Sequence, residues 1–238
     1  PEHTGQYDKP LPSPGVDTGL GLERMTSVLQ EVKANYDTDL FMHIIEAVQE
    51  LAGTSDKERD ANIVPYRVIA DHVRAAVFLI GDGVIPGAKG RDSVTRMVIR
   101  RAARFGKKIG LNEPFLAYVA DAVIETMGTH YTDIVDRAEA IKRSISREET
   151  LFGRTLDRGL SELDEMLSKL PEGGTLSGED AFYLKSTVGL PIQVTRDIVE
   201  ERGYAVDMSG FYEAEERHSE VSGGGQAMGV IASNDQYA

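Results

Sequence analysis

A short stretch near the start of the chain brings together groups that could hold a small anion beside an amine. Residues 14–25 read PGVDTGLGLERM. Gly19 and Gly21 allow positive φ and the close approach of a ligand to the backbone. Arg24 stands in the first turn of a predicted helix and suits a phosphate, while Asp17 can face a cation. The stretch therefore predicts a site for an amino acid next to a nucleotide, and a glycine turn that merely starts a helix is the alternative.

A basic island lies in an otherwise acidic protein. The net charge of −13 argues against a polyanionic partner for the chain as a whole. Residues 1–110, however, carry 15 basic and 15 acidic side chains, whereas residues 111–238 carry 11 and 24. Residues 91–108 alone hold seven basic side chains and one acidic. This local excess needs a local explanation.

The basic island coincides with a predicted helix from Asp92 or Ser93 to Phe105, ended by Gly106. We expect its buried stripe to consist of Val94, Met97, Val98, Ala102 and Phe105.

The cations of this helix are predicted to form an outward row. Arg96, Arg100 and Arg104 are spaced by four residues and so share one face, and Arg101 and Lys107 flank them. No acid follows in the helix to offset their repulsion. Either RNA phosphates or acidic side chains from residues 111–238 must neutralise this positive charge, and the sequence leaves both possibilities open.

Two other features favour structural roles. The glycine-rich loop over residues 81–90 lacks the Gly-Lys-Ser/Thr of a phosphate-binding loop. His72 lies on the apolar face of a predicted helix, as a hydrogen-bonded core histidine would, and without further ligands at metal spacing. We therefore expect no metal site.

Composition bounds the class of protein. The chain has 238 residues, 41% of them hydrophobic, and no cysteine, which excludes disulfides and fits a reducing cytoplasm. No run of 18 apolar residues is present, so no membrane span is predicted. The first residues show no signal-peptide pattern and look like a cut end.

Hydrophobic periodicity predicts a mainly helical fold. Residues 53–62 and 223–238 are expected to be loops, and residues 203–207 a short extended piece. The predicted helices cover residues 20–33, 39–51, 64–80, 92–105, 112–127, 133–170, 179–184, 191–202 and 209–222.

The motif and its sequel resemble one enzyme family. VDTGLGLERM is similar to the third signature motif of class II aminoacyl-tRNA synthetases, in the form typical of the alanyl-tRNA synthetases. The segments 35–41 (NYDTDLF), 70–74 (ADHVR) and 100–104 (RRAAR) recur in that family in the same order. The resemblance covers about residues 10–219.

This resemblance implies a multihelical domain preceded by the last strand and helix of a class II catalytic α/β domain. We expect residues 1–35 to close the catalytic domain, residues 36–222 to form the helical tRNA-recognition domain, and residues 223–238 to be a glycine-rich tail.

The resemblance also implies roles at the motif. Arg24 would contact the phosphates of ATP, which the full-length enzyme uses with magnesium, and Asp17 would hold the ammonium group of alanine. Gly19 and Gly21 would leave room for the substrates. Glu23 would steady the turn or capture ribose or metal indirectly.

The helical domain of this family grips the tRNA acceptor stem. By resemblance, the binding residues would be Arg91, Arg96, Arg100, Arg101, Arg104, Lys107 and Ser186. The family reads a G·U wobble pair with an Asn and an Asp, but Ala88 and Ser186 occupy those places here. How this chain would meet the wobble pair is therefore left open.

The other two class II motifs are expected upstream, so this polypeptide alone should not activate alanine. Two further hypotheses are a tRNA-binding paralogue without catalysis and a helical scaffold whose basic row meets an acidic protein surface.

Overall fold

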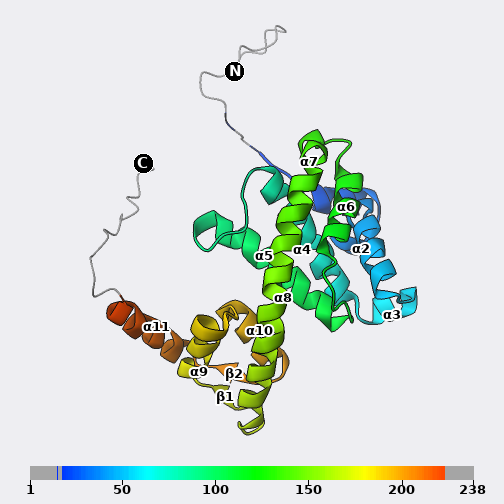
Figure 1. Cartoon of the computed structure of the whole chain (residues 1–238). Helices are drawn as coiled ribbons and strands as arrows, with labels where there is room; N and C mark the ends of the chain where they lie inside the picture. Colours follow the sequence, from blue (N-terminus) through cyan, green and yellow to red (C-terminus); the bar gives the residue numbers. More distant parts are fainter. Residues whose placement is uncertain (1–14, 16–17, 223–238) are drawn as a thin grey trace.

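The computed structural model describes residue 15 and residues 18–222, which are mainly helical (Figure 1), so the predicted fold class is confirmed. In chain order the elements are α1 (Leu22–Leu29), the 3-10 helix η1 (Asn35–Asp37), α2 (Asp39–Ala52), α3 (Asp56–Ala61), α4 (Ile63–Gly81), α5 (Gly90–Lys108), α6 (Leu116–Met127), α7 (Thr132–Asp136), α8 (Ala138–Ser168), β1 (Thr175–Leu176), α9 (Gly178–Tyr183), the π-helical segment η2 (Leu184–Val188), α10 (Ile192–Glu201), β2 (Ala205–Val206) and α11 (Met208–Ser222).

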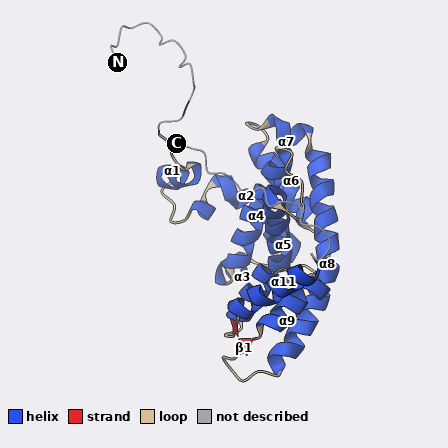
Figure 2. Ribbon diagram, turned by 90° about the vertical axis from the view of Figure 1, so that its left-hand side faces the viewer, coloured by secondary structure: helices blue, strands red, loops and turns tan. Residues whose placement is uncertain are grey.

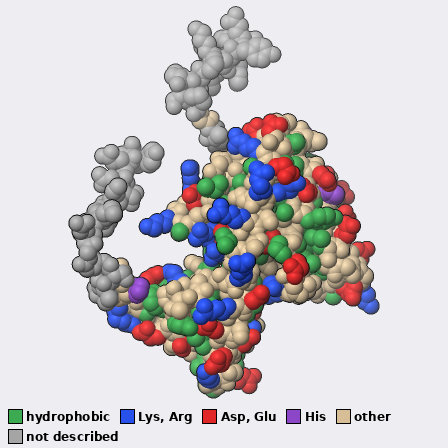
Figure 3. All heavy atoms as spheres, viewed as in Figure 1, with side chains coloured by type: hydrophobic (Ala, Val, Ile, Leu, Met, Phe, Trp, Pro, Cys, Tyr) green, Lys and Arg blue, Asp and Glu red, His purple; other side chains and the backbone are tan. Residues whose placement is uncertain are grey.

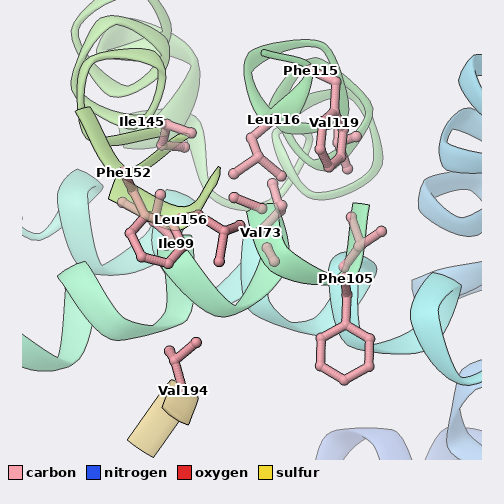
Figure 4. Packing of buried hydrophobic residues seen from close by; sticks show 14 of the residues in the cluster. Val73, Ile99, Phe105, Phe115, Leu116, Val119, Ile145, Phe152, Leu156 and Val194 are labelled. Carbon is pink, nitrogen blue, oxygen red and sulfur yellow. The ribbon is translucent and has the colours of Figure 1, made fainter. Parts of the chain in front are cut away.

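Helix α4 is the centre of a bundle that α2, α5, α6 and α8 complete. It is apolar on most sides and contacts all four of these helices. Ile99 of α5 and Phe152 and Leu156 of α8 belong to one continuous hydrophobic core (Figure 4). Val194 of α10 belongs to the same core, so the apolar contacts extend beyond the bundle.

Helix α8 joins the bundle to a second, smaller unit formed by residues 175–222, which we call the lower unit. Figure 2 shows α8 running along one side of both parts. The predicted helix over residues 133–170 is instead two helices, because α7 ends at Asp136 and α8 begins at Ala138. The guanidinium of Arg137, between them, donates to the Gly81 carbonyl. Gly153 and Gly159 do not interrupt α8.

The lower unit is built around a two-stranded parallel pairing. Thr175 pairs with Ala205 and Leu176 with Val206, and the crossover between them contains α9, η2 and α10. Ser177 caps α9 by accepting from the Asp180 N–H. The predicted extended piece near residue 205 is likewise confirmed.

Three local predictions were wrong. Residues 53–62 contain the helix α3, which Ser55 and Glu58 stabilise through a reciprocal capping box. Helix α1 ends at Leu29 rather than near residue 33. Gly106 does not end α5, since the helix continues to Lys108. A Cβ at Gly106 would lie 2.3 Å from the Phe115 ring, so this glycine serves close packing.

The predicted strand before residue 18 and the tail over residues 223–238 lie outside the described residues. The expected domain boundaries at residues 35 and 222 stay predictions.

A buried carboxylate of α8 holds the start of α6. Glu149 is 5% exposed and accepts from the backbone N–H groups of Phe115 and Leu116. These are among the N–H groups that a helix leaves without a partner at its first turn. Burial raises the pKa of Glu149 to about 7, against the lowering effect of the two N–H donors.

This carboxylate predicts a pH dependence of stability. Its pKa is raised from 4.5 to about 7, so between these values the folded chain keeps a proton that the unfolded chain has lost. Stability should therefore fall as the pH rises through this interval, by up to about 1.4 kcal/mol per pH unit. Urea unfolding of the chain between pH 5 and pH 8 measures this slope. Glu149→Gln should remove it, and parallel curves for the two proteins would contradict the assignment.

Candidate active-site segment and nucleic-acid interface

The motif segment is exposed and leads directly into α1. Thr18, Gly19, Leu20 and Gly21 are all exposed, and α1 begins at the next residue. The expectation of positive φ is not met: Gly21 has φ −72°, and Gly19 has no positive φ either. A Cβ at Gly19 would meet nothing within 4 Å. The backbone of this chain therefore does not require glycine at either position.

The two charged residues of α1 point in different directions. Arg24 is exposed, and its guanidinium makes no ion pair with the described residues. Glu23 instead contacts α4, where Arg74 donates to its carboxylate over 2.5 Å. Asp17, the residue expected to hold an ammonium group, lies outside the described residues. The structure thus leaves Arg24 open to a ligand and gives Glu23 a partner within the protein.

A cleft lies beside the start of α1. It has a volume of about 280 Å³. Its walls come from α1, α4 and α6 and from the segment after α6, and they are formed by Leu22, Glu23, Asp71, Arg74, Ala75, Phe78, Met127 and Tyr131. Residues 18–21 of the motif segment are therefore exposed, and an open cleft lies beside them.

The predicted outward row of cations on α5 is wrong. Arg104 is 3% exposed, with its Nη2 atom 2.5 Å from the Glu201 carboxylate and its Nη1 atom 3.5 Å from that of Asp197. Desolvation lowers the pKa of Arg104, and the two carboxylates of α10 act against this lowering. A guanidinium nonetheless keeps its charge in proteins, so Arg104 is a buried cation whose two carboxylate partners stay partly exposed.

Two further arginines of α5 share one buried carboxylate of α8. The Arg100 Nε atom lies 2.7 Å from the Glu148 carboxylate, and the Arg96 Nε atom lies 3.7 Å from it. The Arg100 guanidinium also stacks over the Phe152 ring at 5.0 Å. Arg96 keeps partial exposure, whereas Arg100 is mostly covered.

Of the remaining residues predicted to bind tRNA, some lie near carboxylates and others are exposed without an ion pair. Lys107 pairs with Asp157 at 3.0 Å, and Arg101 lies 3.9 Å from Asp197. Arg91 is exposed and makes no ion pair with described residues, and Ser186 is exposed on η2.

The cations of α5 do not form an outward row because this helix is rotated relative to the prediction and is covered on several sides. Val94, assigned to the buried stripe, is 54% exposed, whereas Thr95 and Ile99 are fully covered. Helices α4 and α8 cover α5 on two sides, and carboxylates of α10 reach a third. A cation enclosed in this way needs a carboxylate partner. The acidic neighbour from residues 111–238 is therefore present within the chain itself.

An open cationic surface does exist, on α8. Arg143, Arg147, Arg154 and Arg158 are exposed and fall within an arc of about 60° of the helix. We call them the α8 arginine stripe. Arg158 pairs with Glu162 at 2.9 Å, whereas the other three form no ion pair with the described residues. Figure 3 shows Lys and Arg side chains following α8 down this face and extending to the start of α5.

Sequence reasoning missed the α8 arginine stripe although its signal was present. The separations of four, seven and four residues are those of one helical face. The negative net charge of residues 111–238 concealed it, since α8 also carries seven acidic side chains that outnumber its five basic ones.

A groove borders the upper part of this stripe. It lies between α8 and the segment that leads into α5, and has a volume of about 710 Å³. Arg96, Arg143 and Arg147 supply its cationic side, and Ile85, Pro86 and Leu151 supply apolar surface. Ser144 and the carboxylate of Glu148, which lies 3.7 Å from Arg96, also line it. Together these groups suit a ligand that carries both phosphates and apolar ring faces.

Metal and membrane sites are not found in the described part of the chain. No cluster of three or more His, Cys, Asp or Glu side chains in residues 18–222 could hold a metal ion. Within the same residues, no helix combines the length and apolarity that crossing a bilayer requires. The Nδ1 atom of His72 lies 3.0 Å from the Asp71 carboxylate on a half-buried face of α4, but this buried nitrogen makes no hydrogen bond within the described chain, so the hydrogen bond expected of a core histidine is not seen there.

Comparison with known proteins identifies the family of the chain. The family model described as tRNA synthetases class II (A) matches residues 2–236. Alanine–tRNA ligases of Streptococcus pyogenes serotype M3 and Streptococcus agalactiae serotype V are each 41% identical over 208 residues, which is 87% of this chain and 24% of the relative.

The chain belongs to the class II tRNA synthetase (A) family. The resemblance read from the motif is thereby confirmed. This class II synthetase chain spans about a quarter of the length of the curated relatives it matches.

Because Arg104 of α5 is a buried cation, we expect its removal to destabilise this synthetase chain. Arg104→Met should remove the buried cation from between the carboxylates of Asp197 and Glu201, which would keep only the more exposed Arg101 and Lys108 as partners. Because both carboxylates are partly exposed, we expect a loss of about 1–3 kcal/mol in the free energy of unfolding, measured by urea titration. Arg154→Met is the matched control and should change it by less than about 0.5 kcal/mol. Equal losses in the two variants would contradict the internal role of Arg104.

Proposed function

We propose that this chain is the central part of an alanine–tRNA ligase, which activates alanine with ATP and transfers it to tRNA. The observation that carries the proposal is the 41% identity to alanine–tRNA ligases over 87% of the chain. The exposed motif segment and the cleft beside α1 support it, since an activation site must stay open to substrates.

In this proposal the motif segment contributes to the activation of alanine. The alanine carboxylate attacks the α-phosphate of ATP, a bond to this phosphorus forms, and pyrophosphate leaves. Arg24, exposed and without a partner in the described chain, would stabilise the phosphate charge. Asp17 would hold the alanine ammonium, and Gly19 and Gly21 would keep the backbone accessible. Orientation and charge stabilisation do this work without a covalent protein intermediate.

Class II synthetases use ATP with magnesium. The described residues contain no cluster that could hold the ion by itself, and Glu23 already pairs with Arg74. We therefore assign no step through magnesium to this chain.

We further propose that the tRNA acceptor stem lies along the α8 arginine stripe rather than along α5. A-form RNA offers phosphates and 2′-hydroxyls more readily than base edges in its deep groove. Arg143, Arg147 and Arg154 are exposed cations without carboxylate partners among the described residues. Arg91 and Arg96 lie at the start of α5, where Figure 3 shows the cationic face continuing. Arg100 and Arg104, in contrast, have their charge satisfied within the protein.

The places that read the wobble pair in the family are open to solvent here. Ala88 and Ser186 are both exposed. The Ser186 hydroxyl could hydrogen-bond a base edge or a 2′-hydroxyl, whereas Ala88 could offer only its backbone.

Activation is tested by pyrophosphate exchange. The full-length protein that carries this chain should exchange labelled pyrophosphate into ATP when alanine is present, because adenylate formation is reversible on the enzyme. Arg24→Ala should lower kcat/KM for ATP by about a hundredfold, as loss of a charge-stabilising donor does. Omission of alanine is the control. Absence of alanine-dependent exchange would favour the non-catalytic tRNA-binding paralogue.

RNA binding is tested by charge reversal on α8. Arg147→Glu and Arg154→Glu should each weaken binding of an acceptor-stem minihelix by about tenfold or more, measured by gel shift at low salt. Each lost phosphate contact should also flatten the dependence of log K on log salt concentration by about 0.7–0.9. Lys57→Glu reverses an exposed charge on α3, away from this face, and serves as the matched control. Unchanged binding by both α8 variants would refute the placement of the stem.

A further inference from the structure

Arg74 of α4 connects the motif helix to the core of the protein. Its Nη2 atom lies 2.5 Å from the Glu23 carboxylate, and the two side chains are 16% and 32% exposed. Its guanidinium also stacks over the ring of Phe41 at 4.1 Å, and Phe41 is buried. A cation held by a fixed aromatic face loses little further freedom when it binds a carboxylate. Arg74 is thus a preorganised partner for Glu23.

A second arginine on the same face of α4 repeats this arrangement. Arg67 lies seven residues before Arg74 and therefore on the same side of the helix. It pairs with the Asp37 carboxylate at 2.9 Å and stacks over the Tyr36 ring at 5.3 Å. The chain from Glu23 to Asp37 is consequently held against α4 at both of its ends.

These ion pairs matter because α1 has little apolar anchorage of its own. None of its residues is buried. Leu22, Val28 and Leu29 are all exposed. Figure 2 shows α1 standing off the bundle beside the start of α2. In the described chain, its position relative to α4 therefore depends strongly on the Arg74–Glu23 contact.

The contact also sets the direction of Arg24. Consecutive residues on an α-helix project about 100° apart. When Glu23 faces α4, Arg24 is turned away from the bundle, and it is indeed exposed. A small rotation of α1 would move both side chains together.

We propose that Arg74 is a positioning residue for the activation of alanine. It binds Glu23, fixes α1, and so aims Arg24 at the phosphates of ATP. This inference rests on the proposed function of Arg24. It assigns Glu23 to the protein scaffold rather than to ribose or metal, and it makes α4 the element through which the helical bundle holds the activation segment in place.

A double-mutant cycle in the full-length protein tests this role. Arg74→Met, Glu23→Ala and the double variant are compared by kcat/KM for ATP in alanine-dependent pyrophosphate exchange. Because misplacement by about 1 Å can cost a hundredfold, each single change should lower this value by about ten- to a hundredfold. The double variant should lose no more than the worse single variant, since both break the same contact. Arg74→Lys should recover part of the activity.

Arg59→Met provides the matched control, because Arg59 is a covered arginine that pairs with Asp56 and Asp60 away from α1. It should leave exchange unchanged even if stability falls. Full activity of Arg74→Met, or losses that multiply in the double variant, would overturn the inference. If Arg74→Met does not fold, full exchange activity of Glu23→Ala would still overturn the inference, because α1 has no buried residues and this variant should fold. Absence of exchange in the unchanged protein would instead refute the proposed function.

Discussion

The ion pairs between α5 and the carboxylates of α8 and α10 are the constraint on which the remaining arrangement depends. Arg96 and Arg100 converge on Glu148, while Arg104 meets Asp197 and Glu201. Apolar packing through Ile99 and Val194 brings these helices together, and the buried cations then admit few alternative orientations, because each enclosed charge needs its partner. The lower unit is therefore attached to the bundle through charge as well as through the continuous helix α8.

The positive charge of this chain consequently serves two purposes in two places. Cations of α5 hold helices together, whereas those of α8 face solvent. Sequence alone shows both groups as basic residues at helical spacing, and only their carboxylate partners separate them. The acidic composition of residues 111–238 gains a meaning from this division, since part of it neutralises the basic island from within the same molecule.

Periodicity was sufficient for the fold class and for most helices, because an apolar stripe reports burial directly. It failed for the rotation of α5, where it placed the exposed Val94 in the buried stripe and did not include the buried Thr95, since a helix covered on several sides has no single apolar stripe. It also missed the capping box of Ser55 and Glu58, although its spacing was readable. The motif at Arg24 was recognised by resemblance, whereas the pairing of Glu23 with Arg74, 51 residues away in sequence, needed coordinates.

The segment around η2 packs against α8, and this has a consequence for how an RNA stem would be held. A Cβ at Gly159 would lie 3.1 Å from Leu190, two residues after η2, so the chain that follows Ser186 lies very close to the α8 backbone. Arg154 stands on the same helix, little more than one turn away. If RNA binds as proposed, Arg154 would contact the RNA backbone and Ser186 a base edge or a 2′-hydroxyl. The folded protein then fixes the spacing between these two contacts before any RNA arrives.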